Sequence, residues 1–581
     1  MGNVAESTQI VVIIYMLLMV GVGLYFYRYQ KGAEDFFKGG SRIPWWAAGI
    51  STYMSGFSAY SFVGIAYLVA SYGAAGMAVE FGPAIAYLIA LLVFARRFNK
   101  ARVLTPIEYL EKRFGPLTRQ IVAWGNILRV LFEGGRLYAV AILISVLTGF
   151  GRTEAIIGCG VVVLLYSVLG GLWAVIVTDV IQFIVLFLTV IPIFIMSIVK
   201  VGGLGELIFN APIGTWSIPA LSSVDKGWLW IAAWWTVYMV NYNSHPGLIQ
   251  RVASTANPKE ARKSAALTFG LALPHSLLLF LPVLIYRSWG WFGKTMDAET
   301  VYGFIATDIL PPTMIGIVIA AMLAAAMSAL DTEYNIQAAI FVNDVYNQKI
   351  RKKASNWELL LVGRLAVIFL TVENVGIALM IHMVDSLNAY EFSKIIAVML
   401  ALTSGIPLLV GIVYKKATQR GAILAMILGF IWAFLHSQDF HNLGMGYLAP
   451  WPMSYQIQAL TTAIVCISTM ILSGFFPRKK KDKVLAKKFF EKLEEKIEYE
   501  KENLGIENVP IPFTIIGVFT VLIGILMLSM LFVEKSAYNR IFTGTIASIL
   551  IILGIVLRYA GYIARKRRNE LIENRDKNSI K

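Results

Sequence analysis

Long apolar segments recur along the whole chain, and they restrict its fold more than any other feature. A helix needs about 20 apolar residues to cross a bilayer, and on that rule we count about fifteen such segments between residues 8 and 564. Hydrophobic residues make up 57% of the 581 residues, and charged residues only 15%. A typical soluble domain carries about 25% charge. The sequence therefore predicts an all-α polytopic membrane protein.

Basic residues follow a clear pattern between these segments. The formal net charge is +16, and the Lys and Arg residues gather in every second connection. These connections are 28–42, 96–113, 251–263, 349–353, 415–420, 478–501 and 565–581. Cytoplasmic loops carry such an excess, so the charge needs no nucleic-acid partner. We expect a multi-pass plasma-membrane protein with its N-terminus outside and its C-terminus in the cytoplasm.

One connection carries enough charge to form a helix of its own. Residues 478–501 alternate Lys and Glu at helical spacing, which is typical of a solvated helix on the cytoplasmic face. Docking of a cytoplasmic partner at 478–501 is the alternative interpretation.

Two apolar segments are interrupted. Segment 45–71 carries serines and glycines in its middle, and segment 227–245 runs into Pro246 and Gly247. Backbone leaves helical geometry at membrane depth only where protein or a water-filled cavity satisfies it. Broken helices at matching places in two repeats are typical of a transporter's binding site. Packing of small residues between helices is the alternative for any single position.

The two interrupted segments lie five spans apart, which favours two inverted repeats. The predicted organisation is an extra transmembrane helix and loop at 1–44, a first inverted repeat at 45–199, an extracellular loop at 200–226, a second inverted repeat at 227–414, two further transmembrane helices at 415–476, a charged cytoplasmic helix at 477–511, two C-terminal transmembrane helices at 512–564 and a basic cytoplasmic tail at 565–581.

Several motifs then resemble a known family. They are DFFKGGSRIPWW at 35–46, TPIEYLEKRFG at 105–115, YSVLGGLWAVIVTDVIQ at 166–182, PGLIQR at 246–251 with KEARK at 259–263, and MSALDT at 327–332 with NDVY at 343–346. The chain resembles the sodium:solute symporter family over residues 8–476. This resemblance implies a LeuT-like five-plus-five inverted repeat, with one N-terminal and about four C-terminal extra helices.

The resemblance also implies cation sites. One would use the main-chain carbonyls of Met54, Phe57 and Ala321, with hydroxyls at the positions of Ala324 and Ala325. A hard cation requires oxygen ligands, and alanine supplies a methyl group, so the expectation of sodium coupling is weakened. A further site would use Asp179 and Ser328, both of which are present. A proton carried by a membrane carboxylate, for which Glu373 is a candidate, is the alternative.

The solute site is implied in the same way. Glu80 lies where sugar-transporting members place a substrate-binding glutamate, Ser61 and Lys394 where they place glutamines, and Ala272 where they place a lysine. Lys394 has three interpretations: it binds a carboxylate, pairs with Glu80, or extends to the outer surface. The remaining candidates for the solute site, Tyr60, Tyr238 and His245, lie on the two interrupted segments, where packing is the alternative role.

These observations favour a secondary transporter over an enzyme. The sequence contains no nucleophile elbow, zinc-spaced His cluster or phosphate loop. We expect cation-coupled symport of a small polar organic solute such as a sugar, carboxylate or amino acid, with Na⁺ or H⁺ as coupling ion and no other cofactor. Proton-coupled transport, uncoupled transport and a transporter-like solute sensor remain as alternatives.

Overall fold

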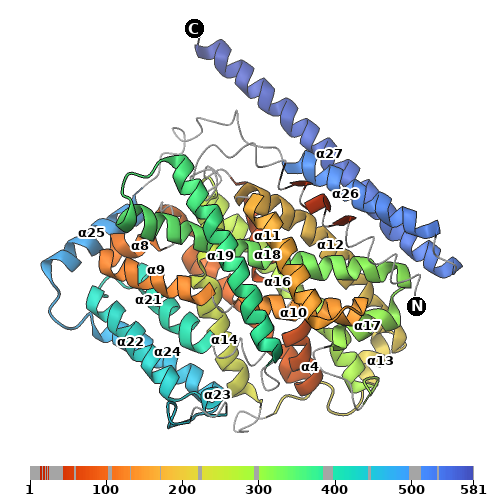
Figure 1. Ribbon diagram of the computed structural model, residues 1–581, viewed down its shortest axis with the longest axis horizontal. Coiled ribbons are helices and arrows are strands. Elements are labelled where there is room, and N and C mark those ends of the chain that lie inside the picture. Colours follow the sequence, from red (N-terminus) through yellow and green to blue (C-terminus); the bar gives the residue numbers. More distant parts are fainter. Residues whose placement is uncertain are drawn as a thin grey trace.

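The computed structural model describes residues 14–15, 17–19, 21–22, 24, 43–57, 61–101, 107–130, 133–169, 172–219, 226–293, 300–383, 397–442, 446–495, 512–532 and 536–579. Throughout these ranges the regular structure is helical, apart from isolated bridges between Ile43 and Thr255 and between Ser437 and Met453. The helices form one bundle (Figure 1). The expected all-α fold is confirmed.

The helices, in chain order, are α3 (Trp45–Gly56), η2 (Ser61–Ile65), α4 (Ala66–Tyr72), α5 (Ala74–Val79), α6 (Gly82–Ile89), η3 (Ala90–Phe94), α7 (Ala95–Ala101), α8 (Glu108–Phe114), α9 (Pro116–Val130), α10 (Gly134–Thr148), α11 (Arg152–Leu169), α12 (Leu172–Lys200), α13 (Leu204–Phe209), α14 (Trp228–Ser244), α15 (Pro246–Ala253), α16 (Pro258–Ser288), α17 (Val301–Ile309), α18 (Pro312–Ile340), η4 (Phe341–Ile350), α19 (Asn356–Met383), η5 (Ala397–Leu402), α21 (Thr403–Val413), α22 (Gln419–Leu435), α23 (Gln438–Phe440), α24 (Tyr455–Leu472), α25 (Lys480–Glu494), α26 (Pro512–Ser529), η9 (Met530–Phe532) and α27 (Ala537–Ser579).

Many of these helices are long and apolar enough to cross a bilayer. Within the described ranges they are Ala74–Ala101, Val175–Lys200, Pro258–Ser288, Met314–Ile350, Asn356–Met383, Tyr455–Leu472 and Ala537–Ile563. The bent pair Trp45–Gly56 and Ser61–Tyr72 passes the same test as one broken span, with 56° between its halves. Shorter apolar helices add to these. The chain is therefore built as a multi-pass membrane protein.

Helix α18 forms the centre of the bundle. The apolar window of its span, Met314–Ile350, is buried throughout within the protein rather than facing outward. Helices α3, α10, α12 and α19 pack around it. Alanines recur along α18, including Ala321, Ala324 and Ala325, and all three are buried. Small side chains let neighbouring helix backbones approach closely, which explains how one helix contacts so many others.

The first interruption lies at the end of α3. This helix ends at Gly56, and Phe57 is extended, with φ −98° and ψ 134°. A Cβ at Gly56 would overlap the hydroxyl oxygen of Tyr87 on α6 and would lie 2.7 Å from Cε1 of Tyr242 on α14. Real Cβ atoms essentially never come this close to another heavy atom, so glycine lets the end of α3 meet the end of α14.

The second interruption separates α14 from α15. His245 is extended, with φ −64° and ψ 121°, and Pro246 occupies the first turn of α15. A residue before proline avoids the helical region, and proline fits the first turn because it has no N–H to satisfy. The predicted break is therefore produced by local backbone chemistry.

The charged connection forms α25, which packs against α7 and α8. Its Phe489 and Phe490 are buried. The Nζ of Lys100 donates to the main-chain oxygens of Leu493 at 2.8 Å and Glu495 at 3.0 Å, so α7 caps the end of α25. Figure 1 shows α8 and α25 at one end of the bundle and α13 and α17 at the other. The apolar face of α25 is thus engaged by its own chain.

The last two helices form a hairpin on the side of the bundle. Helices α26 and α27 pack along each other, and α26 contacts α12. The ring of Phe513 stacks on Trp46 of α3, with centroids 4.5 Å apart. Helix α27 has 43 residues, about 65 Å of helix, which is twice the thickness of a bilayer core. Its C-terminal part accordingly extends beyond the other helices (Figure 1).

Candidate functional site

Asp179 lies at the centre of a buried polar network. Its side chain, on α12, is fully buried. Ser328 on α18 donates to Oδ1 at 2.5 Å, and Ser51 on α3 donates to Oδ2. The Nη2 of Arg251 on α15 donates to Oδ2 at 3.3 Å. Three helices and the second half of a broken span therefore meet at one carboxylate, and the predicted pair Asp179 and Ser328 are in contact.

Arg251 completes this network. Its Nε donates to Ser51 Oγ at 2.6 Å, its Nη2 to Thr332 Oγ1 at 2.7 Å and its Nη1 to the carbonyl of Gly247 at 3.0 Å. The sequence predicts Arg251 at the start of a cytoplasmic connection, which stays a prediction; its side chain is fully buried within the protein. The guanidinium turns inward because α15 brings it within hydrogen-bonding distance of α3 and α18. It supplies the counter-charge that a buried carboxylate requires.

The carbonyl site implied by the resemblance lies on two helices that pack together, α3 and α18. At the end of α3, the carbonyl of Met54 accepts the N–H of Phe57 at 3.2 Å. On α18, Ala321, Ala324 and Ala325 are buried and bring no side-chain oxygen. Any cation held there would depend on main-chain oxygens and on groups from neighbouring helices. Whether Met54, Phe57 and Ala321 bind a cation stays a prediction.

Glu80 lines a small cavity between the two broken spans, which we call the Glu80 cavity. Its lining residues are Tyr53, Gly56, Phe57, Glu80, Pro83, Tyr87, Tyr242, Ala272 and His275. The hydroxyl of Tyr238 donates to Glu80 Oε2 at 2.9 Å, which brings two predicted solute residues together. The cavity volume is about 20 Å³, room for about one water molecule. Binding of an organic solute therefore requires the surrounding helices to part.

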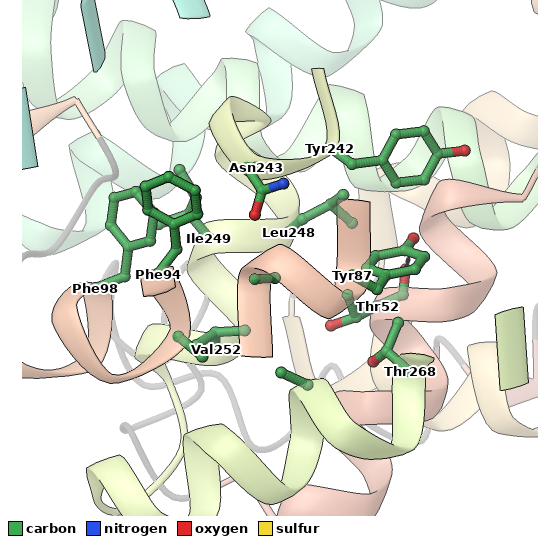
Figure 2. A pocket seen from close by; sticks show the side chains of 13 residues that line it. Thr52, Tyr87, Phe94, Phe98, Tyr242, Asn243, Leu248, Ile249, Val252 and Thr268 are labelled. Atoms are coloured by element: carbon green, nitrogen blue, oxygen red, sulfur yellow. Dashed lines mark hydrogen bonds between the residues drawn. The ribbon is translucent and has the colours of Figure 1, made fainter. Parts of the chain in front are cut away.

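A second cavity adjoins the first. It lies between α3, α7, α14–α15 and α16, and it shares Tyr87 and Tyr242 with the Glu80 cavity. Figure 2 shows that Phe94, Phe98 and Ile249 form one side of it, while the two tyrosines lie on the opposite side. The two tyrosine rings meet edge to face, with centroids 5.2 Å apart. They separate the two cavities.

The other predicted solute residues have different surroundings. Ser61 is buried in η2. His245 lies in the break between α14 and α15, where its Nε2 contacts Glu333 and its Nδ1 accepts the N–H of Gly247 at 3.2 Å. It lines neither of the two cavities. Tyr60 and Lys394 lie outside the described residues.

His275 is a cavity residue that the sequence reasoning missed. Its Nδ1 is 2.5 Å from the hydroxyl of Tyr53, and its ring meets Phe57 edge to face at 4.8 Å. A histidine inside an apolar segment was the available signal. The position of His275 within a long regular helix gave no indication of which face it occupies.

Comparison with known proteins agrees with this architecture. The model of the sodium:solute symporter family matches residues 36–429. The chain is 27% identical over 504 residues to the sodium/glucose cotransporter of Vibrio parahaemolyticus, covering 79% of this chain and 90% of that protein. It is 26% identical over 451 residues to the sodium/sialic acid symporter SiaT of Proteus mirabilis, covering 72% and 86%.

Solved structures support the same fold. A Na⁺-coupled sialic acid symporter in a substrate-bound outward-open state aligns with a TM-score of 0.67 at 20% identity, over 81% of this chain and 98% of that chain. This likeness concerns the fold, which is the expected LeuT-like inverted repeat. Together with the family match over residues 36–429, it shows that this chain belongs to the sodium:solute symporter family.

Proposed function

We propose that this chain carries a small polar organic solute across the plasma membrane together with a cation, with its N-terminus outside and its C-terminus in the cytoplasm. Family membership supports solute symport. The named relatives are sodium-coupled transporters of glucose and of sialic acid. The distribution of basic residues between connections supports the orientation.

One observation carries this proposal: the polar network and the solute cavity share helix α3. Ser51 of α3 donates to Asp179, while Tyr53, Gly56 and Phe57 of the same helix line the Glu80 cavity. A cation that changes the contacts of Asp179 therefore acts directly on the helix that closes around the solute. A ligand shifts a conformational equilibrium only through differential contacts with the two states, and α3 provides them.

In this proposal the solute binds between α3 and α14–α15. Glu80 and Tyr238 contact it, and Ser61, Tyr60, His245 and Lys394 contribute as the helices part. Opening of the cavity to one side and then the other would follow from rocking of the helices around the two breaks.

The cation would bind near Asp179 and Ser328, with the carbonyls of Met54, Phe57 and Ala321 as the neighbouring set of oxygens. The contact of Asp179 with Arg251, at 3.3 Å, is longer than its contact with Ser328, at 2.5 Å. We infer that a sodium ion entering this site displaces the Arg251 guanidinium from Asp179. The hydroxyl of Ser328 stays in place, because hydroxyl oxygens are themselves suitable ligands for sodium.

Proton coupling is the second candidate, and other buried acids favour it. Glu333 contacts His245 at the break between α14 and α15. Among the described residues, both carboxyl oxygens of Glu373 on α19 are buried without a hydrogen-bond partner. Ionisable groups inside membrane spans commonly mark proton pathways.

One experiment separates the two. The melting temperature of the purified full chain would be measured in sodium or potassium at equal ionic strength, from pH 5 to 8. We expect sodium to raise it, because a ligand of the folded state stabilises that state, and we expect Asp179→Asn to remove the rise. Asp308→Asn, on the extracellular helix α17, is the control. A melting temperature that responds to pH and is indifferent to sodium would refute sodium coupling and favour protons.

A further inference from the structure

The Glu80 cavity combines one buried acid, hydrogen-bonding groups already in use and several aromatic rings. From these features we infer that its solute bears a positively charged, alkylated ammonium group. This inference rests on the proposed function as a transporter, and it names the chemical class of the solute.

Charge is the first argument. Among the described residues that line the two cavities, Glu80 is the one acid, none is Lys or Arg, and Glu80 is 4% exposed. Its carboxylate accepts one hydrogen bond, from Tyr238. Among the described residues no Lys, Arg or His forms an ion pair with it. An ionised carboxylate buried without a counter-charge is strongly disfavoured. The closed cavity therefore favours the protonated acid, and a cationic solute would stabilise its ionised form.

Hydrogen bonding is the second argument, and it disfavours a sugar. The hydroxyl of Tyr53 is engaged with His275, and the hydroxyl of Tyr242 donates to the carbonyl of Gly56 at 2.7 Å. The hydroxyl of Tyr87 donates to the carbonyl of Thr52 at 3.4 Å. A sugar presents many hydroxyls, each of which needs a partner when buried. Because the hydroxyls of Tyr87 and Tyr242 already donate their protons to carbonyls, they offer a solute no donor. The acceptor oxygens of a buried hexose would lack partners there, whereas an alkylated ammonium group has no acceptor to satisfy.

The rings are the third argument. Tyr53, Phe57, Tyr87 and Tyr242 all line the cavity. Aromatic rings attract organic cations through their quadrupoles, and cages of such rings recognise quaternary ammonium groups. The methyl groups of an alkylated ammonium pack on rings and require no hydrogen bonds, which matches what this lining offers.

The second cavity agrees with the same solute. Its lining is mainly aromatic and aliphatic, with polar groups from Thr52, Asn243 and Thr268 and no basic residue. In Figure 2 the apolar side chains Phe98, Leu248 and Val252 surround it. A carboxylate solute would meet no Lys or Arg among the described residues that line the two cavities, so these residues disfavour an anion.

The test compares choline with 3,3-dimethyl-1-butanol, a neutral molecule of nearly the same shape. Binding to the full chain in lipid nanodiscs would be measured by calorimetry, with D-glucose and acetate as further probes. We expect choline to bind at least tenfold more tightly than its neutral analogue. Glu80→Gln keeps the shape of the side chain and should weaken choline binding at least tenfold. Glu206→Gln, an exposed acid on α13, should leave it unchanged.

Several results would overturn the inference. Equal binding of choline and the neutral analogue would do so without any variant, even if Glu80→Gln fails to fold. Tighter binding of glucose would do so as well. Acetate binding that is lost in Lys394→Met would mean that Lys394 brings a positive charge to the solute and that the site takes an anion. In each of these cases sodium-dependent stabilisation of the wild-type chain can persist, so the transporter proposal is judged separately.

Discussion

At the scale of single residues, the contact between Asp179 and Arg251 is the most constrained feature of the protein. Both side chains are fully buried, and a charge removed from water is tolerated only when it is paired and hydrogen-bonded. Ser51, Ser328 and Thr332 supply the additional hydrogen bonds. Because these partners come from different helices, the network also fixes how α3, α15 and α18 meet at α12.

We therefore expect Asp179→Asn to destabilise the protein strongly, by about 3–5 kcal/mol, because it leaves the Arg251 guanidinium buried without a counter-charge. The measurement is the thermal midpoint of the purified protein. Combining Asp179→Leu with Arg251→Met removes both charges and should restore much of the loss. The control, Asp308→Asn, removes a partly exposed partner of Lys200, and such pairs contribute at most about 1 kcal/mol. Equal effects of the two asparagine variants would contradict this assignment.

The sequence allowed the prediction of one half of this network. The resemblance to the family implied Asp179 and Ser328 as a pair, and the two side chains are in contact. Arg251 was predicted only as the first residue of the basic connection 251–263, and its contact with Asp179 was not predicted. Its burial depends on long-range packing of α15 against α3 and α18, which no local pattern encodes.

At the scale of helices, the decisive feature is the close meeting of the two broken spans. Gly56 ends α3 against Tyr242 of α14, and the hydroxyl of Tyr242 donates to the carbonyl of Gly56 at 2.7 Å. The contact joins one helix from each predicted repeat. Any side chain at Gly56 would push these helices apart.

Gly56→Ala should accordingly lower stability by about 1–3 kcal/mol, the usual effect of an extra methyl group in a filled site. Gly270→Ala on α16 is the matched control, since a Cβ there has no neighbour within 4 Å, and alanine favours a helix more than glycine does. Thermal midpoints of both variants give the comparison. Recovery in Gly56→Ala combined with Tyr87→Phe and Tyr242→Leu would identify the clash. A neutral Gly56→Ala would show that the helices do not meet this closely.

Both interruptions were predicted from sequence, since Gly, Ser and Pro act on the backbone locally. The lining of the Glu80 cavity was predicted only in part. Glu80 and Tyr238 were named and are hydrogen-bonded, whereas His275 was missed and His245 pairs with Glu333 instead. Which face of a buried helix points into a cavity is set by its neighbours, and apolar segments that are buried all round carry no amphipathic signal.

At the scale of the whole molecule, the C-terminal hairpin is separable from the rest. The family match ends at residue 429, whereas α26 and α27 begin at Pro512. The hairpin contacts the bundle through α12 and through the stacking of Phe513 on Trp46. Lipid tails are as apolar as these side chains, so lipid can replace most of the contacts that the hairpin makes.

We expect a chain that ends at residue 495, without α26 and α27, to keep sodium-dependent stabilisation and solute binding within about twofold when it is measured in lipid nanodiscs. A chain that ends at residue 477 is the control, because it also loses α25. That helix buries Phe489 and Phe490 and is capped by Lys100. Removing such contacts costs several kcal/mol, so this chain should melt at a clearly lower temperature. If the chain ending at 495 lost its response to sodium, the hairpin would have to act on Asp179 through α12, and the transport unit would include it.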